Sequence, residues 1–193
     1  MIHNMKPYHV AAPFSVKQRA GRKSVLFVSG DADAAERDLL HALESLPPGS
    51  LLPLDFTGIR ISSEAARQLL RRALLRITTG ELSDRYLVLG DLDDSQYNVD
   101  IMLAGESLVA VERTEGEGPQ LRGQVDPAVR ETYDWLLSVS TATASLALEK
   151  LKLSNISTAT NRLANLAKLG LARRVEQRPV SGGGREYVYA AVR

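Results

Sequence analysis

The side chains best suited to chemistry lie near the end of the chain, and they are hydrogen-bond donors and cations rather than nucleophiles. Thr158, Asn161, Arg162, Asn165 and Lys168 follow one another at three- and four-residue spacing, which predicts that they share one face of a helix. An asparagine amide can form two hydrogen bonds with adenine, and an arginine guanidinium can do the same with guanine. The spacing therefore predicts a helical surface that reads base edges.

Short hydroxyl side chains and basic residues flank this predicted helix. Ser157 and Thr158 lie near its N-terminus, where short donors suit a phosphate, and Thr160 completes the predicted DNA-binding set. Four arginines that follow the helix are expected to hold the DNA backbone or to probe the minor groove: Arg173, Arg174, Arg178 and Arg185. Such residues are also common on ordinary solvated surfaces, so it is their combination on one motif that favours DNA binding.

The composition argues against catalysis and against metal binding. The chain has no cysteine, which excludes disulfides, thiolate zinc sites and cysteine nucleophiles. It has only three histidines, all before residue 42, so a histidine-based metal cluster or catalytic triad is not expected. Residues 182–184 are three glycines, but they lack the preceding strand and following helix of a nucleotide-binding loop and are expected to form a turn. We therefore expect no enzyme activity, no cofactor and no metal.

The charge is distributed unevenly along the chain. Residues 1–123 hold 14 basic and 17 acidic residues, whereas residues 124–193 hold 10 basic and 6 acidic ones. Residues 155–193 alone have 7 basic and 2 acidic residues. This asymmetry predicts an acidic or neutral domain joined to one that binds anions.

The elements that position the polar residues can be predicted from the C-terminal sequence. Asp126 and Pro127 are typical of a helix start, a second helix is expected at about 144–151, and a third at about 156–169. In the third helix the side chains expected to face inward are Ile156, Ala159, Leu163 and Leu166. Gly170 ends it, and two strands, 171–175 and 186–190, follow.

The segment from Ser157 to Val175 resembles the recognition helix and first wing strand of winged-helix bacterial regulators of the MarR and ArsR type. In those families a Ser-Thr start, a helix with spaced leucines and a Leu-Gly-Leu step lead into a basic strand. The resemblance covers about residues 126–193. It implies a winged helix-turn-helix domain that binds double-stranded DNA.

Strands and helices alternate in the first part of the chain. Strands are expected at 8–16, 24–29, 51–56, 86–89 and 107–112, with helices between them, the first of which is expected to begin with a capping box formed by Asp33 and Glu36. Such alternation predicts an α/β domain with a largely parallel sheet covered by helices. The polar segment 112–126 contains several Gly and Pro residues and is the best candidate for a linker, although a short strand at about 120–125 could interrupt it. We therefore expect domains at 1–119 and 120–193.

The run from Leu54 to Ser63 resembles the STAS and STAS-like domains of bacterial regulators, in which a strand ends in Asp and serines begin the next helix. In that family one such serine is phosphorylated, which makes Ser62 or Ser63 the candidate phosphosite. This sequence lacks the family's Asp before the serines and the Gly after them, so we prefer the simpler interpretation that one of the two serines caps the helix.

These predictions together describe a cytoplasmic bacterial transcription regulator that binds double-stranded DNA as a homodimer. The STAS-like domain would sense a signal, bind a partner or mediate dimerisation. The alternative is a protein-interaction regulator, similar to an anti-sigma-factor antagonist, in which the winged helix contacts protein instead of DNA.

Overall fold

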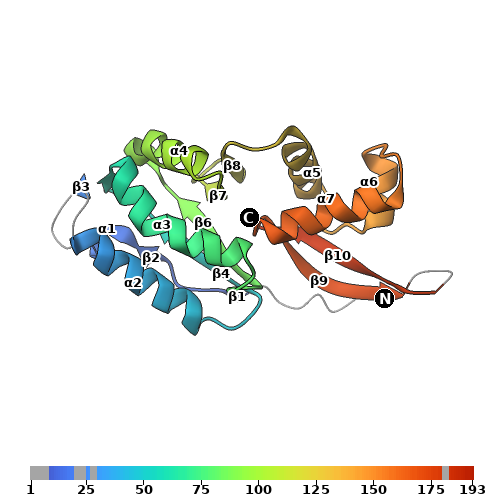
Figure 1. Cartoon of the computed structure of the whole chain (residues 1–193), viewed down its shortest axis with the longest axis horizontal. Coiled ribbons are helices and arrows are strands. Elements are labelled where there is room, and N and C mark those ends of the chain that lie inside the picture. The colour runs from blue at the N-terminus through green and yellow to red at the C-terminus, as the bar shows by residue number, and fades with distance from the viewer. Residues whose placement is uncertain (1–8, 20–24, 27–29, 180–182) are drawn as a thin grey trace. The chain divides into compact units, whose positions relative to one another are not determined.

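The computed structural model of the chain describes residues 9–19, 25–26, 30–179 and 183–193. It forms two compact units, His9–Val125 and Asp126–Val192, each of which we describe by itself (Figure 1). The division falls a few residues after the predicted boundary at 119/120, because residues 120–123 pair with a strand of the first unit. None of the described helices is long and apolar enough to cross a membrane.

The first unit is built on a mostly parallel sheet. Its strand order is β1–β4–β6–β7–β8, and β2 also pairs with β4, so β1 and β2 follow each other along the same edge of β4. All pairings are parallel except that of β7 with β8. The strands are β1 (His9–Val10), β2 (Phe14–Ser15), β4 (Ser50–Asp55), β6 (Arg85–Gly90), β7 (Val109–Arg113) and β8 (Gln120–Gly123). The prediction of a mixed α/β unit with a largely parallel sheet is confirmed.

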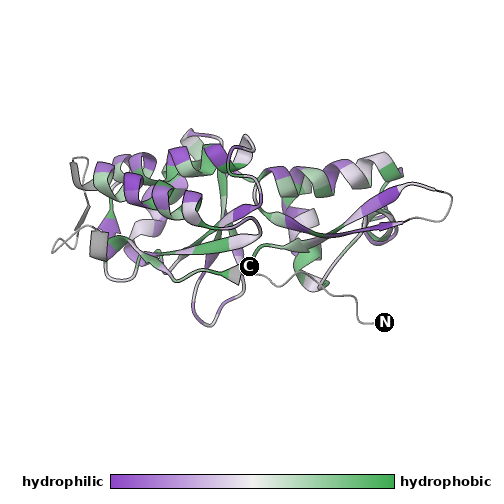
Figure 2. Cartoon of the chain, turned by 90° about the horizontal axis from the view of Figure 1, so that it is seen from below, coloured by the Kyte–Doolittle hydropathy of each residue, from purple (hydrophilic) through white to green (hydrophobic). Residues whose placement is uncertain are grey.

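Helices pack against this sheet. Helix α3 lies between α2 and α4 (Figure 1), and their apolar sides bury the alternate strand residues Leu52, Leu54, Leu87 and Leu89 in one core. Colouring by hydropathy shows the polar sides of these helices on the outside (Figure 2). The elements are α1 (Val16–Arg19), α2 (Gly30–Ser45), α3 (Ser63–Thr78), the 3-10 turn η1 (Asp93–Ser95) and α4 (Gln96–Gly105), together with a short parallel pair, β3 (Val25–Leu26) and β5 (Arg60–Ile61).

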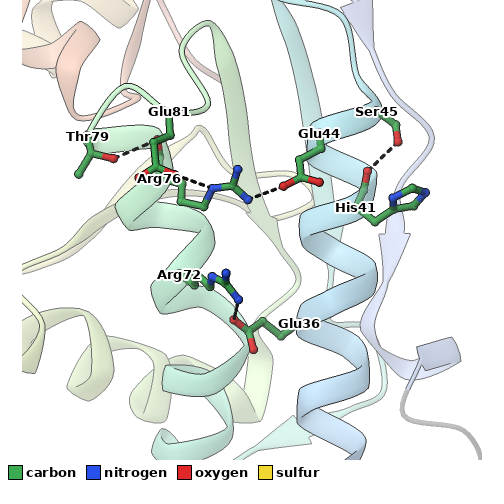
Figure 3. A network of polar contacts seen from close by, with 8 residues as sticks. All are labelled: Glu36, His41, Glu44, Ser45, Arg72, Arg76, Thr79 and Glu81. Carbon is green, nitrogen blue, oxygen red and sulfur yellow. Dashed lines mark hydrogen bonds and ion pairs between the residues drawn. The ribbon is translucent and has the colours of Figure 1, made fainter.

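Ion pairs join the exposed sides of α2 and α3 (Figure 3). The Arg76 guanidinium donates to Glu44 at 2.5 Å and to Glu81 at 3.0 Å, and Arg72 lies 3.9 Å from Glu36. The hydrogen bond from Arg76 lowers the pKa of the Glu44 carboxyl below its ordinary value. Because these side chains are partly exposed to water, the ion pairs contribute little to stability, and the buried leucines provide most of the attraction between the helices.

Two predictions about the first unit are wrong. Helix α2 begins at Gly30, so Asp33 lies inside the helix and its carboxylate accepts a hydrogen bond from Gln68 of α3 instead of forming a capping box with Glu36. The predicted linker 112–126 is largely a hairpin, in which β7 and β8 are joined by a turn that contains Gly116 at φ 81°. The alternative of a short strand at about 120–125 is confirmed, since β8 spans Gln120–Gly123. Residues 24 and 27–29 of the predicted second strand lie outside the described residues.

The second unit has three helices followed by an antiparallel hairpin, as predicted. Asp126 caps the first helix by accepting from the N–H groups of Ala128 and Val129, and Pro127 occupies the first helical position. The buried Tyr133 of that helix donates its hydroxyl to the Val192 carbonyl at 2.7 Å, which ties the helix to the end of the chain. The elements are α5 (Pro127–Ser138), α6 (Ala144–Lys150), α7 (Ile156–Lys168), β9 (Ala172–Pro179) and β10 (Arg185–Ala191).

Candidate nucleic-acid interface

Capping and packing fix the position of α7. Asn155 accepts hydrogen bonds at its side-chain oxygen from the Thr158 N–H at 2.8 Å and from the Thr158 hydroxyl at 3.1 Å, so it forms the N-cap. Ala159, Leu163 and Leu166 are fully buried along one side of the helix. Each N-cap of this kind stabilises a helix by about 1 kcal/mol, and the buried stripe determines which residues must face outward.

The outward side of α7 is polar and accessible. Ser157, Thr160, Asn161, Asn165 and Lys168 are all exposed. At ~100° per residue these positions cluster on the side of the helix opposite the buried stripe. The structure therefore brings together five of the seven α7 residues that the sequence singled out.

Thr158 and Arg162 are half-buried and border this outward face. The Thr158 hydroxyl is used in the cap at Asn155. The Arg162 guanidinium donates to Glu131 of α5 at 2.5 Å, and the Arg162 side chain keeps 25% of its exposure. The prediction that Arg162 shares the outward face is wrong, whereas Thr158 lies about 20° from Asn165 around the helix and borders that face. The predicted inward position of Ile156 is also wrong, because this side chain is 46% exposed.

The hairpin of β9 and β10 packs on the inner side of α7. Val175, Val188 and Ala190 form a small core between these elements. Ala142, in the loop before α6, exchanges two backbone hydrogen bonds of 2.8 and 2.9 Å with Tyr189, so a third extended segment lies beside β10. The helix and the hairpin are therefore parts of one packed unit.

An arginine and two tyrosines meet on one side of the hairpin. The Arg174 guanidinium lies 4.6 Å from the ring centre of Tyr187, and the Tyr187 and Tyr189 rings meet edge to face at 6.3 Å. Tyr187 is 42% exposed, so Arg174 stacks on an accessible aromatic ring. Stacking holds the guanidinium in one orientation while leaving its hydrogen-bond donors available.

The remaining arginines of the hairpin differ in how their charge is used. Arg185 is exposed and forms no ion pair within the described part of the chain, and Arg173 is half-buried. Arg178 donates to Glu176 at 2.6 and 3.1 Å, and these hydrogen bonds raise the pKa of Arg178 above its usual value. The carboxylate of Glu176 therefore offsets the charge of Arg178 in the isolated protein.

Sequence reasoning missed two residues of this region. Asn155 was not among the predicted residues, although an Asn directly before a helical stripe is a strong N-cap signal. Tyr187 gave no signal in the sequence, because its contact with Arg174 depends on the register of β9 against β10, in which a bulge falls beside Tyr189.

The candidate phosphosite of the first unit has a structural role. The Ser62 hydroxyl accepts from the Ala65 N–H at 3.1 Å and caps α3, as the preferred interpretation predicted, and Ser63 is the first residue of that helix. Buried Ser95 holds the preceding segment by accepting from the Ile61 N–H at 3.1 Å and donating to the Ile59 carbonyl at 3.0 Å. Both candidate serines are half-buried, and their phosphorylation stays a prediction.

Within the described ranges, no group of three or more histidine or acidic side chains is arranged to hold a metal ion. Comparisons of the chain with protein-family models, with curated proteins and with solved structures gave no match.

Proposed function

We propose that this protein is a DNA-binding transcriptional regulator. Its second unit would act as a winged helix-turn-helix domain, in which α6 and α7 form the helix pair and the hairpin of β9 and β10 forms the wing. The α/β unit would act as a STAS-like domain that senses a signal, binds a partner or mediates dimerisation.

The observation that carries this proposal is the exposed polar face of α7. Five donor-bearing side chains lie opposite a fully buried apolar stripe on a helix whose N-terminus is capped. The major groove of B-DNA is wide enough to admit one α-helix, and its base edges present acceptors that asparagine and lysine can contact. A helix with this division of its surface can enter the groove without exposing its apolar side.

The residues take different roles in this arrangement. Asn161 and Asn165 lie near the middle of the exposed face, and we assign them to base edges. Ser157 at the N-terminal end and Lys168 at the C-terminal end are assigned to phosphates. On the wing, Arg174 and Arg185 have accessible guanidinium groups and would hold the backbone or enter the minor groove.

The short extended segment at Ala142 supports the winged-helix interpretation. Its pairing with Tyr189 places a third strand-like residue next to the hairpin, before the helix pair in sequence. A wing anchored in this way keeps a fixed position relative to α7. A fixed wing would let one unit contact DNA at two places.

A homodimer fits this function, because two small recognition helices can together read two half-sites. In regulators of this kind, half-sites lie about one helical turn of DNA apart, roughly 34–36 Å. Symmetric dimers are the commonest arrangement of soluble oligomers.

A second candidate function is a protein-interaction regulator whose winged helix contacts protein. The observation that favours it is the pairing of Arg162 with Glu131 and of Arg178 with Glu176. Both pairs reduce the positive charge that the second unit offers to phosphates. The two candidates differ in the expected dependence of duplex affinity on salt.

A salt titration of binding to a random-sequence duplex, followed by fluorescence anisotropy, tests the proposal. Each phosphate contact adds about 0.9 to the slope of log affinity against log salt, so Arg174→Ala and Lys168→Ala should each lower the slope by about one. Arg37→Ala is the matched control, because it removes one exposed positive charge from α2 of the first unit and should leave the slope unchanged. A slope near zero for the parent protein would favour the protein-interaction regulator. A slope that stays at the parent value in both Arg174→Ala and Lys168→Ala would favour it too.

A further inference from the structure

A cavity of about 470 Å³ opens at the carboxyl ends of the parallel strands in the first unit. It lies where β4, β6 and β7 end, and the turn between β7 and β8 forms one wall. In open α/β sheets the carboxyl ends of the strands are the usual place for small ligands, and a volume of this size suits a small organic molecule. We propose that this cavity binds a small organic cation, an amine attached to an apolar body.

The floor of the cavity is apolar. Pro53 of β4 and Val88 of β6 are directly paired across the two strands, and both line the cavity. Because side chains alternate along a strand, they face away from the core residues Leu52 and Leu54 and thus lie on the sheet face opposite the helices. An apolar floor of this kind favours a ligand with a hydrocarbon or aromatic part over a fully hydrated ion.

Two carboxylates lie at the rim. Asp55 ends β4, and Asp91 follows the end of β6, next to the register partner of Asp55. Thr57 connects them, since its N–H donates to Asp55 at 2.8 Å and its hydroxyl lies 3.5 Å from Asp91. Neither carboxylate forms an ion pair with any residue that the structure describes. Glu106 of the same unit, in contrast, pairs with Arg67 and Arg71.

The charge of the lining determines the class of ligand. Four acidic residues and one arginine line the cavity: Asp55, Asp91, Glu115, Glu117 and Arg113. The excess of negative charge disfavours phosphates and carboxylates. Among the described residues, no group of three or more histidine or acidic side chains is placed to hold a metal ion. An ammonium group needs only two or three acceptors, and the rim offers two carboxylates.

This inference concerns binding within the first unit and stands independently of DNA binding by the second. An ammonium group at Asp55 and Asp91 would form charge-assisted hydrogen bonds, which contribute more than neutral ones. An alcohol with the same apolar body as the amine should contact the same floor residues but bind much more weakly, because it is neutral. The difference between these two ligands is the quantity to measure.

The test is a titration of the full chain, labelled for amide NMR, with 2-phenylethylamine and agmatine, and with 2-phenylethanol as the neutral match. We expect amide shifts at Thr57, Gly90 and Gly116, and binding of at least one amine about tenfold or more tighter than that of the alcohol. Asp91→Asn and Asp55→Asn should each remove most of this preference. Asparagine keeps the side-chain oxygen that accepts from Thr57, so the turn can remain intact.

Asp94→Asn is the control, because Asp94 is exposed and does not line the cavity. Amine binding should be unchanged in this variant, and thermal unfolding of each variant should match that of the parent. Three results would each overturn the proposal: no shift at these amides with either amine, equal binding of amine and alcohol, or amine binding that survives both aspartate substitutions. Duplex binding measured in the same variants tells failure of this inference apart from failure of the proposed function.

Discussion

Replacing Glu131 with glutamine should strengthen binding to DNA of any sequence. The carboxylate of Glu131 accepts from the Arg162 guanidinium at 2.5 Å, and Arg162 lies next to Asn161 at the edge of the exposed face of α7. Loss of the carboxylate charge would leave Arg162 available to a phosphate near the recognition helix. If the second unit binds DNA as proposed, this ion pair limits the number of phosphates that it can contact.

The size of the effect follows from the geometry of this single pair. One additional phosphate contact steepens the slope of log affinity against log salt by about 0.9. Between about 50 and 200 mM salt, the affinity of the variant should therefore fall by a factor roughly three to four larger than that of the parent. The two side chains are 25% and 55% exposed, so the pair itself contributes only about 0–1 kcal/mol to stability. A change in duplex affinity would therefore not arise from unfolding.

The assay is fluorescence anisotropy with a random-sequence duplex at several salt concentrations. Asp134→Asn is the matched control, since Asp134 is exposed on the same helix and pairs with no cation among the described side chains. It removes the same charge without releasing an arginine, so its slope should stay at the parent value. Equal slopes for the Glu131 variant, the control and the parent would refute the reasoning.

Three further predictions concern stability. Tyr133→Phe removes a buried donor to a backbone carbonyl and should lower the free energy of unfolding by about 1–3 kcal/mol in chemical denaturation. Gly123→Ala should lower the melting temperature, because φ is 94° and a Cβ would collide with a backbone oxygen, whereas Gly118→Ala has open space and should not. The hydrogen bond from Arg76 lowers the pKa of Glu44, so this interaction stabilises the fold at pH values above the pKa of Glu44 in the unfolded chain. The stabilisation is lost as the pH falls through the pKa of Glu44 in the folded protein. Below about pH 5, the melting temperature of Glu44→Gln should therefore fall less than that of the parent.

Local sequence patterns were sufficient to predict the main helices and strands. The leucine spacing in residues 156–169 predicted α7, and the Asp126–Pro127 start predicted α5 within a residue. Alternation of short apolar runs with helical stripes predicted the parallel sheet. The helix starts and apolar stripes depend on contacts between residues close in sequence, which a single sequence records directly. The order and register of the strands, such as Ser50 beside Arg85, depend instead on distant contacts and were not predicted.

The errors arose where distant contacts decide the outcome. Arg162 has a spacing that suits the exposed face, but its partner Glu131 lies 31 residues earlier, on another helix. Asp33 has the spacing of a capping box, but the helix extends to Gly30 and Gln68 of α3 takes the carboxylate. The segment 112–126 has the composition of a linker, yet its glycines serve a turn between two paired strands. Composition alone does not distinguish a hairpin turn from a linker, because both favour the same residues.

Selection of duplexes from a random pool tests the central claim most directly, with the parent protein compared with Asn161→Ala. If the exposed face of α7 reads base edges, the parent should enrich a defined site, and the variant should lose the preference at one or two adjacent positions at a cost of about 1–3 kcal/mol, with an unchanged salt slope. Enrichment of no site by the parent, or the same site at full preference in the variant, would contradict the assignment of α7 as the recognition helix.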